Sequence, residues 1–247
     1  MTLLVGIINL TPDSFSDGGQ FNDTEDAIQH AERQMKDGAA LLDVGAESTR
    51  PGATPLTSEV EWGRLEPVLL RLLSLYPGHI SVDTYHPETV RRAAQIGPVI
   101  INDVTGMNSP EMIRVVTELK LRVIVSHSPS VDLQLAHQLK PVKSLKAVKG
   151  ALLEKRRLLI YRGLKPEEII LDPGIGFGKS PELNLALLKF AEEVPGIDVM
   201  IGYSRKRFLG DNRFEVEPNL EAGRIAIAAG AKYLRVHDVL AHSNLGI

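Results

Sequence analysis

Polar side chains follow several short apolar runs in this chain of 247 residues, and their types could bind a flat, polar heterocycle. Asp83, Asn102 and Asp172 each come directly after such a run. A carboxylate can accept two parallel N–H bonds from an aminopyrimidinone edge, and an amide both donates and accepts. One alternative is that each residue caps the helix that follows, because Asp and Asn favour that position. The same placement in all three cases favours a shared ligand.

A second group of side chains could bind an anion. Arg235 and His237 flank Val236, so strand alternation places both side chains on one face. Arginine can bind a diphosphate through two parallel hydrogen bonds, and a histidine beside it adds a donor. The alternative is a buried ion pair between Arg235 and Asp238. Lys206 lies among three consecutive cationic residues, one of which could enter the same site.

Asn9 ends the first apolar run and opens a long polar segment. Its side-chain carbonyl is a suitable protein ligand for Mg²⁺, which keeps waters and takes its other oxygens from substrate phosphates. The alternative is a turn residue ahead of the Thr-Pro pair at positions 11 and 12. The chain has no cysteine, which excludes disulfides and thiolate metal sites.

The apolar runs that precede these residues are short and nearly continuous, as expected for parallel strands covered on both faces. We predict strands over Leu3–Ile8, Leu41–Val44, Ile80–Val82, Val99–Ile101, Val123–Val125, Ile169–Leu171, Val199–Ile201 and Tyr233–Val236. Helical periodicity fills the intervals between them. We predict helices over Thr24–Lys36, Glu59–Ser74, Pro87–Gln95, Pro110–Leu119, Leu145–Tyr161, Pro181–Ala191 and Leu220–Ala229.

Eight strands alternating with seven helices predict a (β/α)8 TIM barrel, as one domain over residues 1–247. A doubly wound open sheet is the rival fold, but it usually carries a glycine fingerprint after its first strand, which is missing here. In a barrel, the loops after the strands converge on one rim, where barrel enzymes hold their active sites. The chain ends eight residues after Val239, which predicts a truncated or missing eighth helix.

Composition argues against several classes of partner. The formal charge of −3 gives no support to a nucleic-acid partner. Residues 1–8 are apolar but too short to span a membrane, and they lack the flank and cleavage pattern of a signal peptide. With the absence of cysteine, these features predict a cytoplasmic protein. Lys143, Lys146, Lys149 and Arg156 recur at helical spacing, which predicts a solvated helix face.

Seven segments resemble, in order, the signatures of the dihydropteroate synthases, a family of pterin-binding barrels. They are residues 6–19, 47–53, 81–84, 101–104, 171–179, 204–206 and 235–239. The resemblance implies a transferase of folate biosynthesis whose substrates are a pterin diphosphate and p-aminobenzoate. Its amine substrate would displace diphosphate from the methylene carbon of the pterin. No covalent nucleophile would be needed.

The resemblance also implies roles for individual residues. The pterin would be held by Asp83, Asn102, Asp172 and Lys206. The diphosphate and Mg²⁺ site would comprise Asn9, Arg235 and His237. The p-aminobenzoate pocket would be bordered by Phe15, Thr49, Arg50, Pro51 and Phe177. The residues expected to act in catalysis are Asp83, Asp172, Lys206, Arg235 and His237.

Three features depart from the family pattern. Ser128 stands where a methionine usually packs on the pterin, and Arg207 stands where a serine is common. The last helices of the family contribute to a homodimer interface, and a short or absent last helix would remove part of it. Two other functions stay open, namely a non-catalytic pterin-binding paralogue and a methyltransferase that passes a methyl group from a reduced folate to a corrinoid. The methyltransferase would need no anion site on the last strand.

Overall fold

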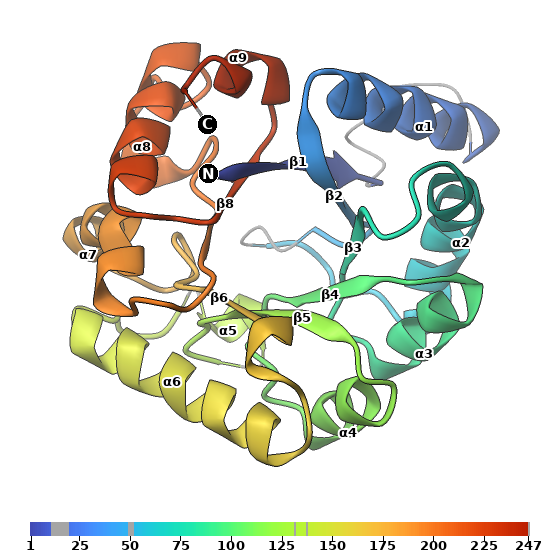
Figure 1. The fold of residues 1–247 in the computed structure, drawn as a ribbon, viewed down its shortest axis with the longest axis horizontal. Coiled ribbons are helices and arrows are strands. Elements are labelled where there is room, and N and C mark those ends of the chain that lie inside the picture. The colour runs from blue at the N-terminus through green and yellow to red at the C-terminus, as the bar shows by residue number, and fades with distance from the viewer. Residues whose placement is uncertain (11–19, 49–51, 131, 137, 247) are drawn as a thin grey trace.

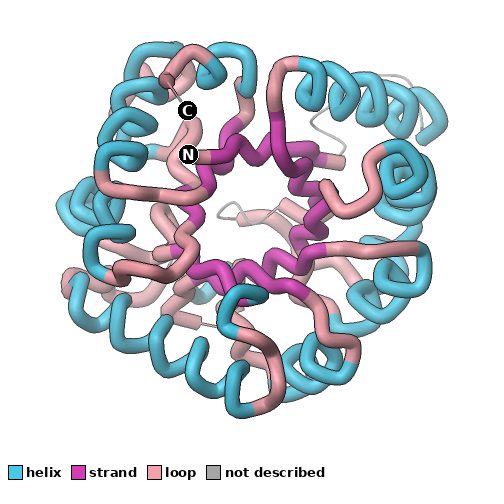
Figure 2. Tube along the Cα trace, in the orientation of Figure 1, coloured by secondary structure: helices cyan, strands magenta, loops and turns pink. Residues whose placement is uncertain are grey.

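The computed structural model describes the chain except for residues 11–19, 49–51, 131, 137 and 247. A ring of eight strands lies inside a ring of helices (Figures 1 and 2). The strands are β1 Leu3–Asn9, β2 Ala39–Gly45, β3 Ile80–Asp83, β4 Ile100–Asp103, β5 Arg122–Ser126, β6 Ile169–Asp172, β7 Met200–Ile201 and β8 Tyr233–Val236. The helices are α1 Gln20–Lys36, α2 Ser58–Leu75, α3 Pro87–Ile96, α4 Pro110–Glu118, α5 Leu133–Ala136, α6 Leu145–Tyr161, α7 Pro181–Ala186, α8 Val216–Ala228 and α9 Val239–Ser243.

The strands follow the order β6-β5-β4-β3-β2-β1-β8-β7, and each neighbouring pair is parallel. A single parallel bridge between Leu171 and Val199 joins the two ends of this order, β6 and β7. Beside it, the Leu171 N–H donates to the Asp198 carbonyl at 2.9 Å. The ring therefore closes, which confirms the predicted (β/α)8 barrel and excludes the open sheet.

Alternation along the strands divides the core in two. One set of side chains fills the interior of the barrel: Val5, Leu41, Ile100, Ile124, Ile170, Met200 and Tyr233. Residues on the opposite face of the same strands pack against the helices, among them Leu4, Leu42, Ile101, Val125 and Leu234. Because both faces are covered, the strands read as continuous apolar runs in the sequence.

Serine or threonine precedes four of the helices and caps them. The side chains of Thr57, Ser109, Ser144 and Ser180 each accept a hydrogen bond from the backbone N–H three residues further on. These bonds satisfy donors that the first turn of a helix leaves without a partner. The predicted starts of α2, α4, α6 and α7 lie within one residue of the observed ones for this reason.

Three helix predictions were wrong at their boundaries. Helix α1 begins at Gln20, four residues before the predicted Thr24. The helix predicted over Pro181–Ala191 ends as an α-helix at Ala186 and continues as a 3₁₀ helix over Leu187–Glu193. A 3₁₀ turn aligns residues three apart, and it buries Leu187 with Phe190 on this segment. Helix α8 begins at Val216, four residues before the prediction, because Pro218 lies in its first turn, where a missing N–H is tolerated.

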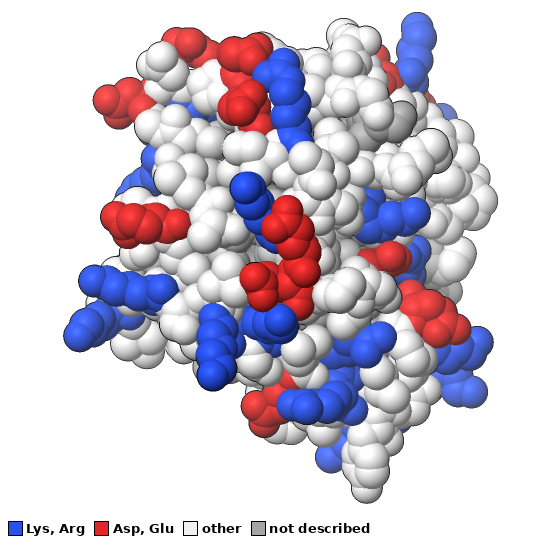
Figure 3. All heavy atoms as spheres, turned by 60° about the vertical axis from the view of Figure 1, so that its left-hand side comes forward, with Lys and Arg blue, Asp and Glu red and all other residues white. Residues whose placement is uncertain are grey.

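The last helix and the surface agree with the expectations of the sequence. Helix α9 spans five residues, and the Asp238 carboxylate accepts a hydrogen bond from the Ala241 N–H at 2.9 Å. On the face drawn in Figure 3, acidic and basic side chains are interspersed. Lys146 is exposed on α6 and Lys149 lies 3.2 Å from Glu193, as expected for a solvated helix face. Of the other two residues predicted there, Lys143 is exposed but precedes α6, and Arg156 is half-buried. In the described part of the chain, no helix is long and apolar enough to cross a membrane.

Candidate active site

The upper interior of the barrel, near the carboxyl ends of the strands, is polar. Two residues beyond the apolar interior positions, the strands carry Asp43, Asn102, Asp172 and Arg235 on the same face. Strand β3 adds Ser81 and Asp83, which pair in register with Asp43 and Gly45 of β2. Asp83, Asn102, Asp172 and Arg235 therefore all lie on the face of their strands that lines the barrel interior.

Asp43 is the centre of this polar layer. It is fully buried, and its Oδ2 lies 2.5 Å from the Arg235 Nε and 2.9 Å from the Asn102 Nδ2. The Ser81 hydroxyl donates to its Oδ1. Arg235 also donates from Nη2 to the Asp83 Oδ2 at 2.8 Å. Four strands are thereby joined through side chains alone.

Arg235 compensates two buried acids. Burial and the neighbouring carboxylate of Asp43 raise the pKa of Asp83 to about 8, and Arg235 acts in the opposite direction. The alternative of a buried ion pair is therefore correct in kind, but the partners of Arg235 are Asp43 and Asp83, and the Asp238 carboxylate caps α9 instead. Sequence reasoning did not single out Asp43. The sequence feature that could have identified it is a charged residue inside an otherwise apolar run.

The capping alternative for the strand-end residues also fails. The residues that precede α3, α4 and α7 at the cap position are His86, Ser109 and Ser180. Asn102 instead donates to Asp43, and its Oδ1 is buried without a hydrogen-bond partner among the described residues. A buried acceptor that lacks a donor costs about 1–3 kcal/mol, so a ligand N–H at this point would stabilise the layer.

Asp172 and Lys206 lie on the other side of the interior. The Asp172 Oδ1 accepts a hydrogen bond from the Gly174 N–H at 2.7 Å. Burial raises the pKa of Asp172, and the positive charge of Lys206 opposes this effect. Burial lowers the pKa of Lys206 to about 8. The Lys206 ammonium donates to the Ile175 carbonyl at 2.5 Å and lies 5.1 Å from the centre of the Phe177 ring.

The backbone after β7 turns Lys206 inward. Arg205 has a φ of 59°, a left-handed conformation that L residues seldom adopt. Its N–H donates to the Asn219 Oδ1 at 2.9 Å, and the Asn219 amide donates to the carbonyls of Arg213 and Glu215. Arg205 and Arg207 are exposed on either side of Lys206. Of the three cationic residues, Lys206 is therefore the one that enters the mouth.

Lys179 supports the loops that carry Asp172 and Phe177. Its ammonium is buried and donates to the carbonyls of His127, Gly174 and Phe177 at 3.0, 2.7 and 3.0 Å. All three of its N–H donors are used, which ties the segment after β5 to the segment after β6. Sequence reasoning quoted this lysine within a motif but assigned it no role.

Some of the remaining predicted site residues lie in the described part of the chain, and others lie outside it. The His237 ring Nδ1 lies 3.0 Å from the Ser204 hydroxyl, and Asn9 is half-buried on the face of β1 that carries Val5. Phe15, Thr49, Arg50 and Pro51 lie outside the described residues. Ser128 donates to the Ser130 carbonyl at 2.6 Å, within its own turn.

The barrel fold and the polar layer at its mouth define a (β/α)8 protein with a small-molecule site at the carboxyl ends of its strands. The family described as "Pterin binding enzyme" matches residues 5–237. The dihydropteroate synthase of Synechocystis is 36% identical over 256 residues, which cover 99% of this chain and 88% of that protein. The chain therefore belongs to the dihydropteroate synthase family of pterin-binding transferases.

Two solved structures share the fold closely. The dihydropteroate synthase of Xanthomonas albilineans with 4-aminobenzoic acid has a TM-score of 0.89 and 36% identity, covering 98% of this chain and 90% of that chain. The dihydropteroate synthase of Anaplasma phagocytophilum with bound 6-hydroxymethylpterin-monophosphate has a TM-score of 0.86 and 32% identity, covering 99% of this chain and 96% of that chain.

Proposed function

We propose that this chain joins p-aminobenzoate to 6-hydroxymethyl-7,8-dihydropterin diphosphate, giving 7,8-dihydropteroate and diphosphate. The observation that carries the proposal is the Asn102 Oδ1 in the polar layer, which is buried without a hydrogen-bond partner among the residues that the structure describes. A pterin edge offers the N–H donors that this oxygen and the Asp172 carboxylate would accept. The ligands of the two solved relatives, a pterin monophosphate and 4-aminobenzoic acid, support the same substrate classes.

The pterin would lie between the two sides of the mouth. Asn102 and Asp172 would accept its N–H groups, and Lys206 would donate to its ring oxygen or nitrogen. Asp83, held by Arg235 at 2.8 Å, would add negative potential beside the ring. This potential would stabilise the positive charge that develops on the methylene carbon as its bond to oxygen breaks.

The diphosphate would lie towards β8 and β1. Arg235 and His237 are the donors on that side, and Asn9 is the candidate ligand for Mg²⁺. One half-buried amide oxygen suits a cation that keeps most of its waters and binds substrate phosphates. When bound there, Mg²⁺ would neutralise charge on the diphosphate oxygens. The Arg235 guanidinium would hold the departing oxygens in place.

In the reaction, the amine nitrogen of p-aminobenzoate forms a bond to the methylene carbon while the carbon–oxygen bond to diphosphate breaks. The electron pair leaves with the diphosphate, and the amine proton passes to solvent or to the leaving group. Phe177 would border the p-aminobenzoate ring, since it lies beside Lys206 at the mouth. The enzyme contributes position and charge, and no covalent intermediate is required.

The activity is tested by incubating the protein with both substrates and Mg²⁺ and following dihydropteroate and diphosphate together. We expect equal amounts of the two products. Asp172→Asn keeps the shape of the side chain and should lower the rate about 100-fold or more, because it removes a charge from the site. Pterin binding without any product would favour a non-catalytic paralogue over this proposal.

The anion side is tested with Arg235→Ala. This change should weaken binding of the pterin diphosphate far more than binding of a pterin without phosphates, because it also leaves Asp43 and Asp83 to repel the diphosphate. Arg157→Ala, on the exposed face of α6, is the matched control. Equal losses for the two ligands would remove the role assigned to Arg235. Magnesium dependence is measured in the same assay after chelation and readdition of the cation.

Two further expectations stay predictions. A cytoplasmic location rests on the absence of cysteine, which suits a reducing compartment. A homodimer rests on resemblance alone, and α9 offers only five residues for a contact there. Light scattering on the purified protein would measure its oligomeric state.

A further inference from the structure

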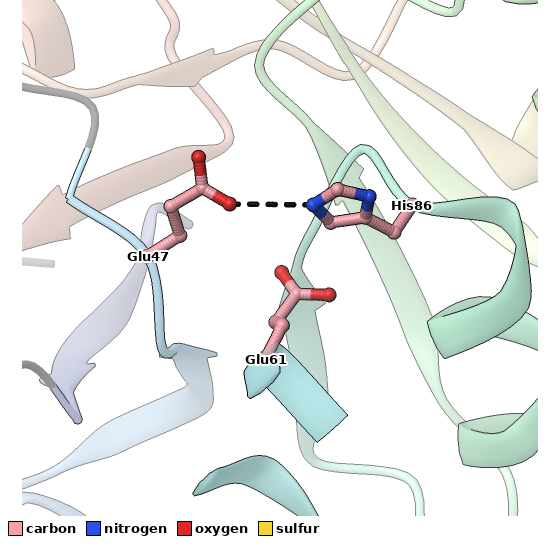
Figure 4. Close-up of side chains that lie close together, drawn as sticks. All are labelled: Glu47, Glu61 and His86. Carbon is pink, nitrogen blue, oxygen red and sulfur yellow. Dashed lines mark hydrogen bonds and ion pairs between the residues drawn. The ribbon is translucent and has the colours of Figure 1, made fainter. Parts of the chain in front are cut away.

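A second group of titratable side chains lies outside the barrel interior, between the segments that follow β2 and β3. It consists of Glu47 after β2, Glu61 in the first turns of α2 and His86 at the start of α3. One possible ligand atom from each residue lies within 4.8 Å of those from the other two. Figure 4 shows the Glu61 carboxylate directed towards the space beside the contact between Glu47 and His86.

One oxygen of this cluster lacks a partner. The Glu61 side chain is fully buried, and its Oε2 accepts hydrogen bonds from the hydroxyls of Thr84 and Thr89 at 2.8 and 2.5 Å. Its Oε1 is buried without a hydrogen-bond partner among the residues that the structure describes. A buried, unpaired carboxylate oxygen is costly, so the folded protein gains free energy if a cation or donor reaches it.

The charges of the cluster are also unbalanced. Its two carboxylates face one imidazole, whose Nε2 lies 3.3 Å from the Glu47 Oε2. Burial raises the pKa of Glu61, His86 lowers it and Glu47 raises it further. The nearby Arg64 directs a guanidinium nitrogen to the Ala46 carbonyl at 3.0 Å. Among the residues that the structure describes, no ion pair joins a lysine or arginine to Glu47 or Glu61.

We propose that Glu47, Glu61 and His86 bind a first-row divalent cation, with Zn²⁺ as the preferred ion. Two carboxylate oxygens and one imidazole nitrogen are ligands that Zn²⁺ accepts, leaving a fourth position for water. The nitrogen ligand disfavours Mg²⁺ and Ca²⁺, which prefer oxygen. The occupied site would have no net charge, because two ionised glutamates balance the dication and the histidine is neutral. The proposal does not depend on the reaction proposed above.

Neighbouring hydrogen bonds already orient the three ligands. The Tyr85 hydroxyl donates to the Glu47 Oε1, which leaves the Glu47 Oε2 for the cation. The two threonine hydroxyls on the Glu61 Oε2 leave its Oε1 free in the same way. Such outer contacts fix the direction of metal ligands and are typical of metal sites. The bound cation would cross-link the β2–α2 segment, α2 and the start of α3.

An ion could reach the cluster from the side of His86. The His86 side chain is 18% exposed, whereas that of Glu47 is 7% exposed and Glu61 is fully buried. The competing explanation is that a protonated His86 alone balances the carboxylates. That arrangement would bind a proton and no metal, so the two explanations differ in a direct measurement.

The test is calorimetric titration of Zn²⁺ into the full chain after removal of metals, without substrates. We expect one tight equivalent in the wild type and a loss of affinity on the order of 100-fold in His86→Gln and Glu61→Gln. His79→Gln and Glu66→Gln change exposed residues of the same types and should bind as the wild type does. Co²⁺ in place of Zn²⁺ should give visible absorption that both cluster variants lose.

Folding of the variants is followed by circular dichroism, and a thermal scan gives a second readout. Zn²⁺ should raise the Tm of the wild type and leave that of His86→Gln unchanged, because binding only to the folded state stabilises it. His86 is partly exposed, so this variant should fold even if Glu61→Gln does not. Absence of a stoichiometric wild-type site, or wild-type affinity in folded His86→Gln, would overturn the proposal.

Discussion

The interior of the barrel changes from apolar to charged within two residues along the same strands. Ile100 and Ile170 pack in the lower half, while Asn102 and Asp172 occupy the upper half directly above them. The lower half buries apolar surface and stabilises the fold. The upper half buries several carboxylates and the Asn102 amide, whose Oδ1 has no hydrogen-bond partner among the described residues. The lower half of the barrel interior therefore contributes stability, and the upper half holds the candidate binding site.

The largest expected effect is that of Arg235→Ala in the upper half. The change leaves Asp43 and Asp83 buried without their cation, which should lower the free energy of unfolding by about 3–5 kcal/mol. Urea denaturation measures this loss. Adding Asp43→Asn to Arg235→Ala should recover part of it, since one of the two unpaired charges is then gone. Unchanged stability in Arg235→Ala would mean that Asp43 and Asp83 do not need this cation in the folded protein.

In the lower half, Ile124→Ala should cost about 3 kcal/mol, because it removes buried methyl groups and leaves a cavity. The variant should still bind the pterin with nearly unchanged affinity at temperatures where it is folded. Leu70→Ala is the control, since that side chain is 53% exposed on α2. A loss of pterin affinity as large as the loss of stability would remove the distinction between the two halves.

Lys206 should make stability depend on pH. Its pKa is about 8 in the folded protein against an ordinary value of 10.5, so between these values the unfolded chain binds a proton that the folded chain has released. The contribution of Lys206 therefore rises with pH across this window, by at most about 1.4 kcal/mol per pH unit, and is lost as the pH falls to about 8. Urea midpoints measured across the window should show this slope in the wild type.

Lys206→Met should lower that slope by at most about 1.4 kcal/mol per pH unit and leave the part that Lys179 contributes, because burial also lowers the pKa of Lys179 to about 7. Lys189→Met, at an exposed position, should keep the whole slope. An unchanged slope in Lys206→Met would assign the pH dependence to another group. Because the Lys206 amine is buried next to Asp172, we expect the pterin affinity to change over the same pH window.

Ser81→Ala is expected to have the smallest effect. It removes one donor from the buried Asp43, which keeps its bonds to Arg235 and Asn102, so the loss should be about 1 kcal/mol. Ser74→Ala, at an exposed position of α2, is the control in the same denaturation experiment. A loss of 3 kcal/mol or more would mean that Ser81 holds the whole layer together.

Residues at strand ends were predictable, whereas Asp43, inside a strand, was not. Asp83, Asn102 and Asp172 follow apolar runs, and the convergence of strand ends in a barrel places them together. Asp43 lies inside a run whose two faces are both apolar, so no alternation marks it as directed inward. Its role depends on Arg235, which is 192 residues away in the chain.

The same limit applies to the cluster around Glu61. An acidic residue in the first turn of a helix is favoured by the helix dipole, and nothing local distinguishes a buried one. Only packing of α2 against α3 brings it to His86 and Glu47. The 3₁₀ turn after α7 was missed for a related reason, since it follows from the burial of Leu187 and Phe190 in the assembled core.

The closing seam of the barrel is its thinnest join. Strand β7 has two residues, and one bridge, between Leu171 and Val199, links it to β6. Asp172 lies on one side of this join and Lys206 on the other, and the Lys206 bond to the Ile175 carbonyl crosses it. A molecule bound to both side chains would fasten the cylinder at the place where its backbone ladder is shortest. Binding of that molecule at the mouth would therefore also slow amide hydrogen exchange where β6 meets β7.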